Sequence, residues 1–170
     1  RSVIVDPDGR IVVAGQRGDS LLVARLQANG TLDAGFGSGG IYQSPEAFGY
    51  TARVARAAAD GYRVIVQVPA GGMGWDCSVV GLTGAGVPDA AFGNAGIVQQ
   101  LSPGSGSLRC TSLAVQPDGR ILFGGAEDDT DGYVGRLLAN GVDQPAGSDV
   151  AGARDDKSQG AFVDPPDAQA

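Results

Sequence analysis

The sequence predicts an all-β protein in which a unit of four antiparallel strands repeats along the chain. Three observations support this class. Glycine accounts for 29 of the 170 residues, about 17% against roughly 7% in an average globular protein. Three turn motifs recur with a common period of about 55 residues. The segments between these turns are short runs of β-branched and aliphatic residues, which are typical of strands.

The first recurring motif is a tight turn between the first two strands of each unit. Residues 3–15, VIVDPDGRIVVAG, return as residues 113–125, LAVQPDGRILFGG, and a degraded copy lies in residues 57–66. Proline fixes the first dihedral of such a turn, and glycine supplies the positive φ that lets the chain reverse. The sequence therefore predicts equivalent turn positions for Gly9, Gly61 and Gly119.

Two further motifs follow in the same order in each unit. A turn closes the third strand at Gly30, Gly86 and Gly141, and the Asn-Gly pair found in two copies is a strong hairpin signal. A glycine-rich loop then reads DAGFGSGGI from Asp33 and DAAFGNAGI from Asp89. The third unit ends before it reaches this loop.

The runs between the turns predict four strands per unit. In the first unit they are residues 2–6, 10–14, 21–26 and 41–43, and in the second they are 50–57, 62–68, 77–82 and 97–101. Runs such as residues 10–14 and 62–66 are almost entirely apolar, which is typical of strands covered on both faces. A radial stack of small sheets provides such cover, so the sequence predicts β-propeller-like, four-stranded antiparallel blades.

The domain prediction is one repeat module, residues 1–142, followed by a tail. The units are about 1–43, 50–101 and 108–142. Residues 143–170 are rich in Pro, Ala and Asp, with six aspartates against Arg154 and Lys157. A segment with so few apolar side chains cannot offset its ordering entropy, so a low-hydrophobicity acidic tail or linker is expected. Docking of Phe162-Val163 on a neighbouring unit is the alternative.

These motifs resemble a known repeat. The strings DPDGRIVVAG, ARLQANGTLD and FGSGG of the first unit are similar to the bacterial delta-60 repeat, a β-propeller-like repeat of large exported and surface proteins. The resemblance spans residues 3 to about 142 and is weakest in the second unit, where no proline precedes Asp60. It implies a scaffold in an extracellular or cell-surface setting, and it supplies no catalytic residues.

Composition excludes several classes of function. The chain has no histidine, which excludes Ser-His and Cys-His catalysis and imidazole metal sites. Its 12 basic and 19 acidic residues give a net charge of -7, whereas nucleic-acid binding calls for clustered Arg and Lys. No stretch approaches the roughly 20 apolar residues of a membrane-spanning helix.

Two pairs of residues are expected to join adjacent units. Cys77 and Cys110 lie in neighbouring units, and a disulfide between them is expected in an exported protein, with two buried thiols as the alternative. Phe36 and Phe92 each follow an aspartate by three residues. We expect them to fill the gaps between blades, with ligand stacking as the alternative, while Asp33 and Asp89 cap loop amides.

Two candidate binding sites lie in turns. Glu127, Asp129 and Asp131 imitate the start of a calcium loop, but the twelfth position is Leu138 instead of glutamate. A solvated acidic turn is the simpler interpretation, and calcium is the one cofactor that the sequence suggests. Met73 and Trp75 lie in an elongated turn unique to the second unit; local packing and contact with a glycan or protein are both open.

The functional hypothesis is a non-enzymatic scaffold or adhesion module of a bacterial surface protein that binds a protein or glycan. The alternative is a structural subunit or displayed domain of an extracellular filament such as a pilus, and a third hypothesis is a calcium- or glycan-binding module. Because propellers close with 4 to 8 blades, three units leave two open faces. Further repeats, self-association of two copies or a capping partner would cover them.

Overall fold

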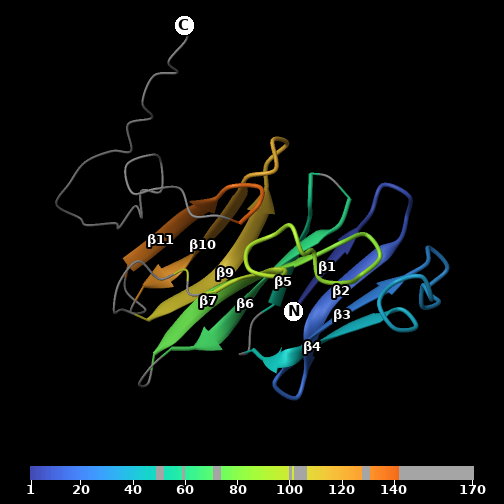
Figure 1. Cartoon of the computed structure of the whole chain (residues 1–170), viewed down its shortest axis with the longest axis horizontal. Coiled ribbons are helices and arrows are strands. Elements are labelled where there is room, and N and C mark those ends of the chain that lie inside the picture. Colours follow the sequence, from blue (N-terminus) through green and yellow to red (C-terminus); the bar gives the residue numbers. More distant parts are fainter. Residues whose placement is uncertain are drawn as a thin grey trace, which may run out of the picture.

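The computed structural model describes residues 1–48, 52–58, 60–70, 74–99, 101, 107–127 and 131–141, with residues 52, 127 and 131 described by their backbone alone. Every regular element in these ranges is a β-strand (Figure 1), which confirms the all-β prediction. The strands are β1 (Ser2–Val5), β2 (Ile11–Arg17), β3 (Ser20–Leu26), β4 (Ile41–Ala47), β5 (Ala52–Arg56), β6 (Tyr62–Pro69), β7 (Trp75–Leu82), β8 (Ile97–Val98), β9 (Leu108–Val115), β10 (Ile121–Glu127) and β11 (Asp131–Leu137).

The strands form three antiparallel sheets, each in chain order. Blade 1 contains β1 to β4, blade 2 contains β5 to β8, and blade 3 contains β9 to β11 within the described residues. Blade 2, green in Figure 1, lies between the blue blade 1 and the yellow and orange blade 3. Strand β5 contacts β1 and β2 on one side and β9 on the other, so the blades stack through their first strands.

Blade 2 is covered on both faces, as its apolar runs predict. In β6, Val64 and Val66 pack with side chains of blade 1, whereas Ile65 packs with side chains of blade 3. In β7, Val80 faces blade 1 and Val79 faces blade 3. Successive side chains of a strand point to opposite faces, so an uninterrupted apolar run supplies two hydrophobic cores at once.

Blade 1 is covered on one face, which corrects the expectation for residues 10–14. Val12 and Ala14 are buried against blade 2, but Val13 on the opposite face is partly exposed. On the same face Val3 and Val5 are 62% and 68% exposed. No other blade lies against this face in the described part of the chain, so the outward side chains of β1 and β2 remain at the surface.

The turn of the second unit differs from the prediction by one residue. The Asp6 N–H donates to the Arg10 carbonyl at 2.8 Å, and in blade 3 the same bond joins residues 116 and 120. In blade 2 it joins Ala57 to Gly61 at 2.9 Å. Gly61 therefore takes the place of Arg10, and its predicted equivalence with Gly9 and Gly119 is wrong. The reason is that the second unit lacks the Pro-Asp-Gly sequence, and Asp60 stands where Gly9 stands in the first unit.

Several strands differ in length from the sequence prediction, among them β4 and β8. Strand β4 extends from Ile41 to Ala47 because its far end returns to pair with β3, where Ser20 faces Ala47 across a register shift. Strand β8 contains only Ile97 and Val98, which pair with β7. The predicted tail, residues 143–170, lies outside the described residues.

Candidate functional sites at the blade interfaces

The phenylalanine loops connect each blade to the next in the same way. Phe36 and Phe92 are fully buried, one in each interface. The amide of the following glycine donates to a turn of the next blade, Gly37 to the Ala85 carbonyl at 2.8 Å and Gly93 to the Asn140 carbonyl at 2.7 Å. The two loops therefore make equivalent contacts with the turn that closes the third strand of the next blade.

A glycine in that turn lies directly against the phenylalanine ring. A Cβ atom on Gly86 would stand 2.6 Å from Phe36 Cδ2, and one on Gly141 would stand 2.7 Å from Phe92 Cε2. Both glycines also have positive φ, 73° and 76°, which L-residues with a side chain rarely adopt. Turn conformation and ring packing therefore both favour glycine here.

Each phenylalanine loop also holds an arginine–aspartate pair from its own blade. In blade 1 the buried Arg25 places Nε 2.8 Å from Asp33 Oδ2 and its guanidinium carbon 4.8 Å from the centre of the Phe36 ring. In blade 2, Arg63 Nη2 lies 3.0 Å from Asp89 Oδ2, and the guanidinium carbon is 4.3 Å from the Phe92 ring. Cation–π contact and an ion pair thus accompany each buried ring.

The two arginines reach equivalent places from different strands. Val12 of β2 pairs with Arg25 of β3, and at the corresponding cross-strand pair Arg63 of β6 faces Gly81 of β7. Paired residues share one face of a sheet, so either strand can deliver the guanidinium. A Cβ on Gly81 would lie 2.6 Å from the Phe92 ring. The sequence analysis identified neither arginine. Position 81, which aligns with Arg25, is a glycine, and this difference between the units was a signal that another residue takes over the role of Arg25.

The aspartates of these loops have the capping role that the sequence predicts. Asp33 Oδ1 accepts a hydrogen bond from the Gly35 amide, and Asp89 Oδ1 accepts one from the Ala91 amide, each at 3.2 Å. Burial raises the pKa of Asp33, but the hydrogen bonds from Gly35 and Arg25 outweigh burial and hold that pKa below its usual value. The carboxylate is therefore charged at neutral pH and bound to its partners.

A second polar group spans the interface between blades 1 and 2. The Tyr62 hydroxyl donates to Asp6 Oδ2 at 2.5 Å, and Arg56 Nη1 lies 2.9 Å from Asp6 Oδ1. The Asp6 carboxylate is fully buried. Burial raises the pKa of Tyr62 above its usual value, and the hydrogen bond to Asp6 is the second cause of this rise. Arg25 adds a bond across the interface, because its Nη1 donates to the Gly84 carbonyl at 2.5 Å.

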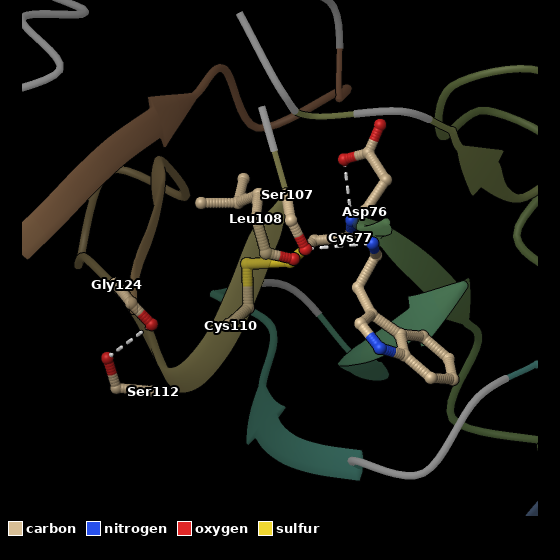
Figure 2. The surroundings of a disulfide bond; sticks show 8 residues. Asp76, Cys77, Ser107, Leu108, Cys110, Ser112 and Gly124 are labelled. Carbon is tan, nitrogen blue, oxygen red and sulfur yellow. Dashed lines mark hydrogen bonds between the residues drawn. A yellow bond between two sulfur atoms is a disulfide. The ribbon is translucent and has the colours of Figure 1, made fainter. Parts of the chain in front are cut away.

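Blades 2 and 3 are joined covalently. Figure 2 shows the disulfide between Cys77 of β7 and Cys110 of β9, with an S–S distance of 2.08 Å and a Cα–Cα distance of 6.1 Å. Both residues are buried. The disulfide that the sequence predicts is thus present, and it attaches the third strand of blade 2 to the first strand of blade 3.

The two predicted turn sites are only partly described. Trp75 is the first residue of β7 and is half-buried, and its amide donates to Ser107 Oγ at 2.9 Å. Met73, Asp129 and the side chains of Glu127 and Asp131 lie outside the described residues. Among the described side chains, no three carboxylates or cysteines gather as metal ligands.

A segment of the first unit is similar to a known family. Residues 7–36 match the model of a domain of unknown function (DUF5122) described as a beta-propeller. Comparison with curated proteins and with solved structures finds no match. The described residues form no helix long and apolar enough to cross a membrane. The matched segment includes β2, β3 and Phe36, so the chain is an all-β stack of propeller-type blades.

Proposed function

We propose that the chain is a part of a delta-60 β-propeller and acts as a non-enzymatic extracellular scaffold that binds a protein or glycan at a bacterial surface. The observation that carries the proposal is that buried arginine and aspartate side chains are paired with each other at the blade interfaces. Arg25 with Asp33, and Arg63 with Asp89, are paired beside a buried ring at the two interfaces. These groups support the loops whose phenylalanine rings lie between the blades, which suits a rigid support for binding loops.

Two further observations support the family and the setting. Residues 7–36, which match a propeller-type family, contain most of the strings that resemble the delta-60 repeat. The Cys77–Cys110 disulfide suits an oxidising compartment, because disulfides persist in secreted and surface proteins and are rare in the cytosol. Together they support export of the scaffold.

Trp75 is the proposed contact residue. It is the first residue of β7 and is half-buried. A partly exposed indole offers an apolar face for a sugar ring or an aliphatic side chain. The backbone amide of Trp75 donates a hydrogen bond to Ser107 Oγ, just before β9, and this bond fixes the start of β7 against blade 3.

Binding to a glycan array and to immobilised surface proteins tests this function. Trp75→Ala is expected to weaken any binding at least about 10-fold, which corresponds to about 1.4 kcal/mol. Val87→Ala is the matched control, because Val87 is 48% exposed in the turn that follows β7, at the other end of the strand. Melting curves establish that both variants fold. Absence of specific binding, or equal loss in both variants, would contradict the proposal.

A structural subunit or displayed domain of an extracellular filament such as a pilus is the second candidate function. The exposed valines on the outward face of blade 1 favour it, because apolar sheet faces can serve subunit assembly. Electron microscopy of the concentrated protein tests this candidate. Ordered polymers would favour it over the binding scaffold, and a uniform field of single particles would count against it.

A further inference from the structure

Blade 1 exposes the same face that the other two blades bury. Val13 pairs with Ala24 in blade 1, as Val64 pairs with Val80 in blade 2 and Phe123 with Gly135 in blade 3. Val64 and Phe123 are 0% and 3% exposed because each faces the preceding blade, whereas Val13 is 37% exposed. Likewise, Val54 is buried at the position that Val3 occupies in blade 1. We call this surface of blade 1, centred on Val3, Val5 and Val13, the open face.

The turn beside the open face has an unused acceptor. In blades 2 and 3 the corresponding turns accept a backbone hydrogen bond from the preceding blade, at Ala85 and Asn140. Asn29 takes this position in blade 1, and its carbonyl accepts no backbone bond from any described residue. The place above the turn glycine is also empty: nothing lies within 4 Å of a Cβ on Gly30, whereas Gly86 and Gly141 each contact a phenylalanine ring.

We propose that the open face docks a further blade of the same repeat type, one that carries an Asp-x-x-Phe-Gly loop. Its phenylalanine ring would lie over Gly30, and the amide of the next glycine would donate to the Asn29 carbonyl. The interfaces of blade 1 with blade 2 and of blade 2 with blade 3 use this loop in the same way, so the added blade would continue an existing pattern. Docking would also cover Val3, since Val54 is buried at the same position of blade 2. The proposal concerns assembly and does not depend on which molecule the scaffold binds.

A second copy of the chain fits this face less well. The blade of a second copy that would present the required face is blade 3. The loop phenylalanine follows the turn glycine by six residues, from Gly30 to Phe36 and from Gly86 to Phe92, but six residues after Gly141 stands Gly147. A second copy therefore lacks the phenylalanine that would fill the place above Gly30.

An extended protein tests the proposal. A second copy of residues 1–51 is placed before Arg1, so that the added blade supplies the loop and is followed by the same sequence that leads from β4 to β5 in the native chain. Val3→Lys is then introduced in the original blade 1, with Val134→Lys on the outward face of blade 3 as the matched control. Thermal melting and backbone hydrogen exchange are measured for the extended and unextended proteins.

In the unextended protein both lysines are expected to leave the melting temperature nearly unchanged, because both positions are exposed. In the extended protein Val3→Lys is expected to lower it by about 5 °C or more, since the ammonium would be buried without a partner, while Val134→Lys has little effect. Extension should also slow exchange of the β1 and β2 amides. Phe36→Ala in the added copy alone should remove most of that protection.

Three outcomes would overturn the proposal. The first is equal effects of the two lysines in the extended protein. The second is an extension that neither raises the melting temperature nor slows exchange in blade 1. The third is self-association of the unextended protein that Val3→Lys abolishes, measured by sedimentation, because this would assign the open face to a second copy.

Discussion

Asp33 is a buried carboxylate whose charge is used inside a blade interface. It accepts hydrogen bonds from the Gly35 amide and from Arg25, whose guanidinium also lies over Phe36. A buried charge is tolerated when its partners satisfy it, and removing one partner leaves the other unpaired. The stability of this interface should therefore depend on the ionisation of Asp33.

The effect of pH on Asp33→Asn follows from the direction of the pKa shift. The pKa of Asp33 is lower in the folded protein than its ordinary value, so its contribution is present above about pH 4, the unfolded pKa, and is lost as pH falls further. We expect Asp33→Asn to lower the melting temperature most near pH 7, with a difference from wild type that shrinks below pH 4. Asp118→Asn, which alters an exposed ion pair, is the control and should have little effect. A difference independent of pH would contradict this role.

Phe36 contributes through packing. Its ring is fully buried between blades, 5.9 Å from the Tyr62 ring and against Gly86. Phe36→Ala should reduce the free energy of unfolding by about 3–5 kcal/mol, because it leaves a cavity in the core. Leu32→Ala, at a 49% exposed residue of the same loop, is the control and should change it by less than about 1 kcal/mol. Urea unfolding measures both, and similar losses would show that the ring is not the source of stability.

At the scale of elements, β6 and β7 form the centre of the molecule. Each has side chains in both hydrophobic clusters, and the disulfide leaves β7 for β9. The hairpin turn between β5 and β6 is where the prediction failed, since Gly61 stands where Arg10 stands in blade 1. The two turns have the same length, so the difference lies in which residue occupies each position: Asp60 takes the place of Gly9. A one-residue shift in this alignment would assign every side chain of β6 to the opposite face.

The disulfide should stabilise the union of blades 2 and 3. Cys77 and Cys110 are 33 residues apart, and closing a loop of this length contributes about 3–4 kcal/mol in the chain-entropy model. The double variant Cys77→Ala/Cys110→Ala should lose about this much in urea unfolding. Adding reductant to the denatured wild-type protein before refolding should reproduce the loss, and it should leave the variant unchanged. Equal stability of the oxidised protein and the variant would refute the prediction.

At the scale of the whole molecule, equivalent positions differ in what covers them. Val79 of blade 2 is fully buried against blade 3, and Val134 occupies the same place in blade 3 but is 51% exposed. Val134 also lines a shallow apolar depression with Leu122 and Ser112. The repeat therefore ends, within the described residues, in one outward apolar face on each side.

Lysine substitution at Val79 and at Val134 tests this difference in burial. Val79→Lys should unfold the protein or lower its stability by more than about 4 kcal/mol, because it buries an unpaired charge. Val134→Lys should remain within about 0.5 kcal/mol of wild type. Circular dichroism during thermal melting distinguishes the two variants. A large loss with Val134→Lys would mean that this face of blade 3 is covered in solution.

The sequence determined the local features of this protein. The recurrence of turn glycines established a repeat of four strands, because turns depend on residues that are neighbours in the chain. The almost entirely apolar run of residues 62–66 correctly indicated burial on both faces, and the positions of Cys77 and Cys110 in adjacent units indicated the disulfide. Phe36 and Phe92 were identified as candidates by their place in the repeated loop.

Only the tertiary structure decided the contacts between strands and between blades. The sequence contained Arg25 and Arg63 but not their equivalence, which depends on cross-strand pairing with Val12 and Gly81. It also assigned the same burial to residues 10–14 and 62–66, which have similar patterns. What separates them is the neighbour: blade 2 has one on each side and blade 1, among the described residues, has one. Periodicity reports which side chains share a face, and only packing shows what lies against that face.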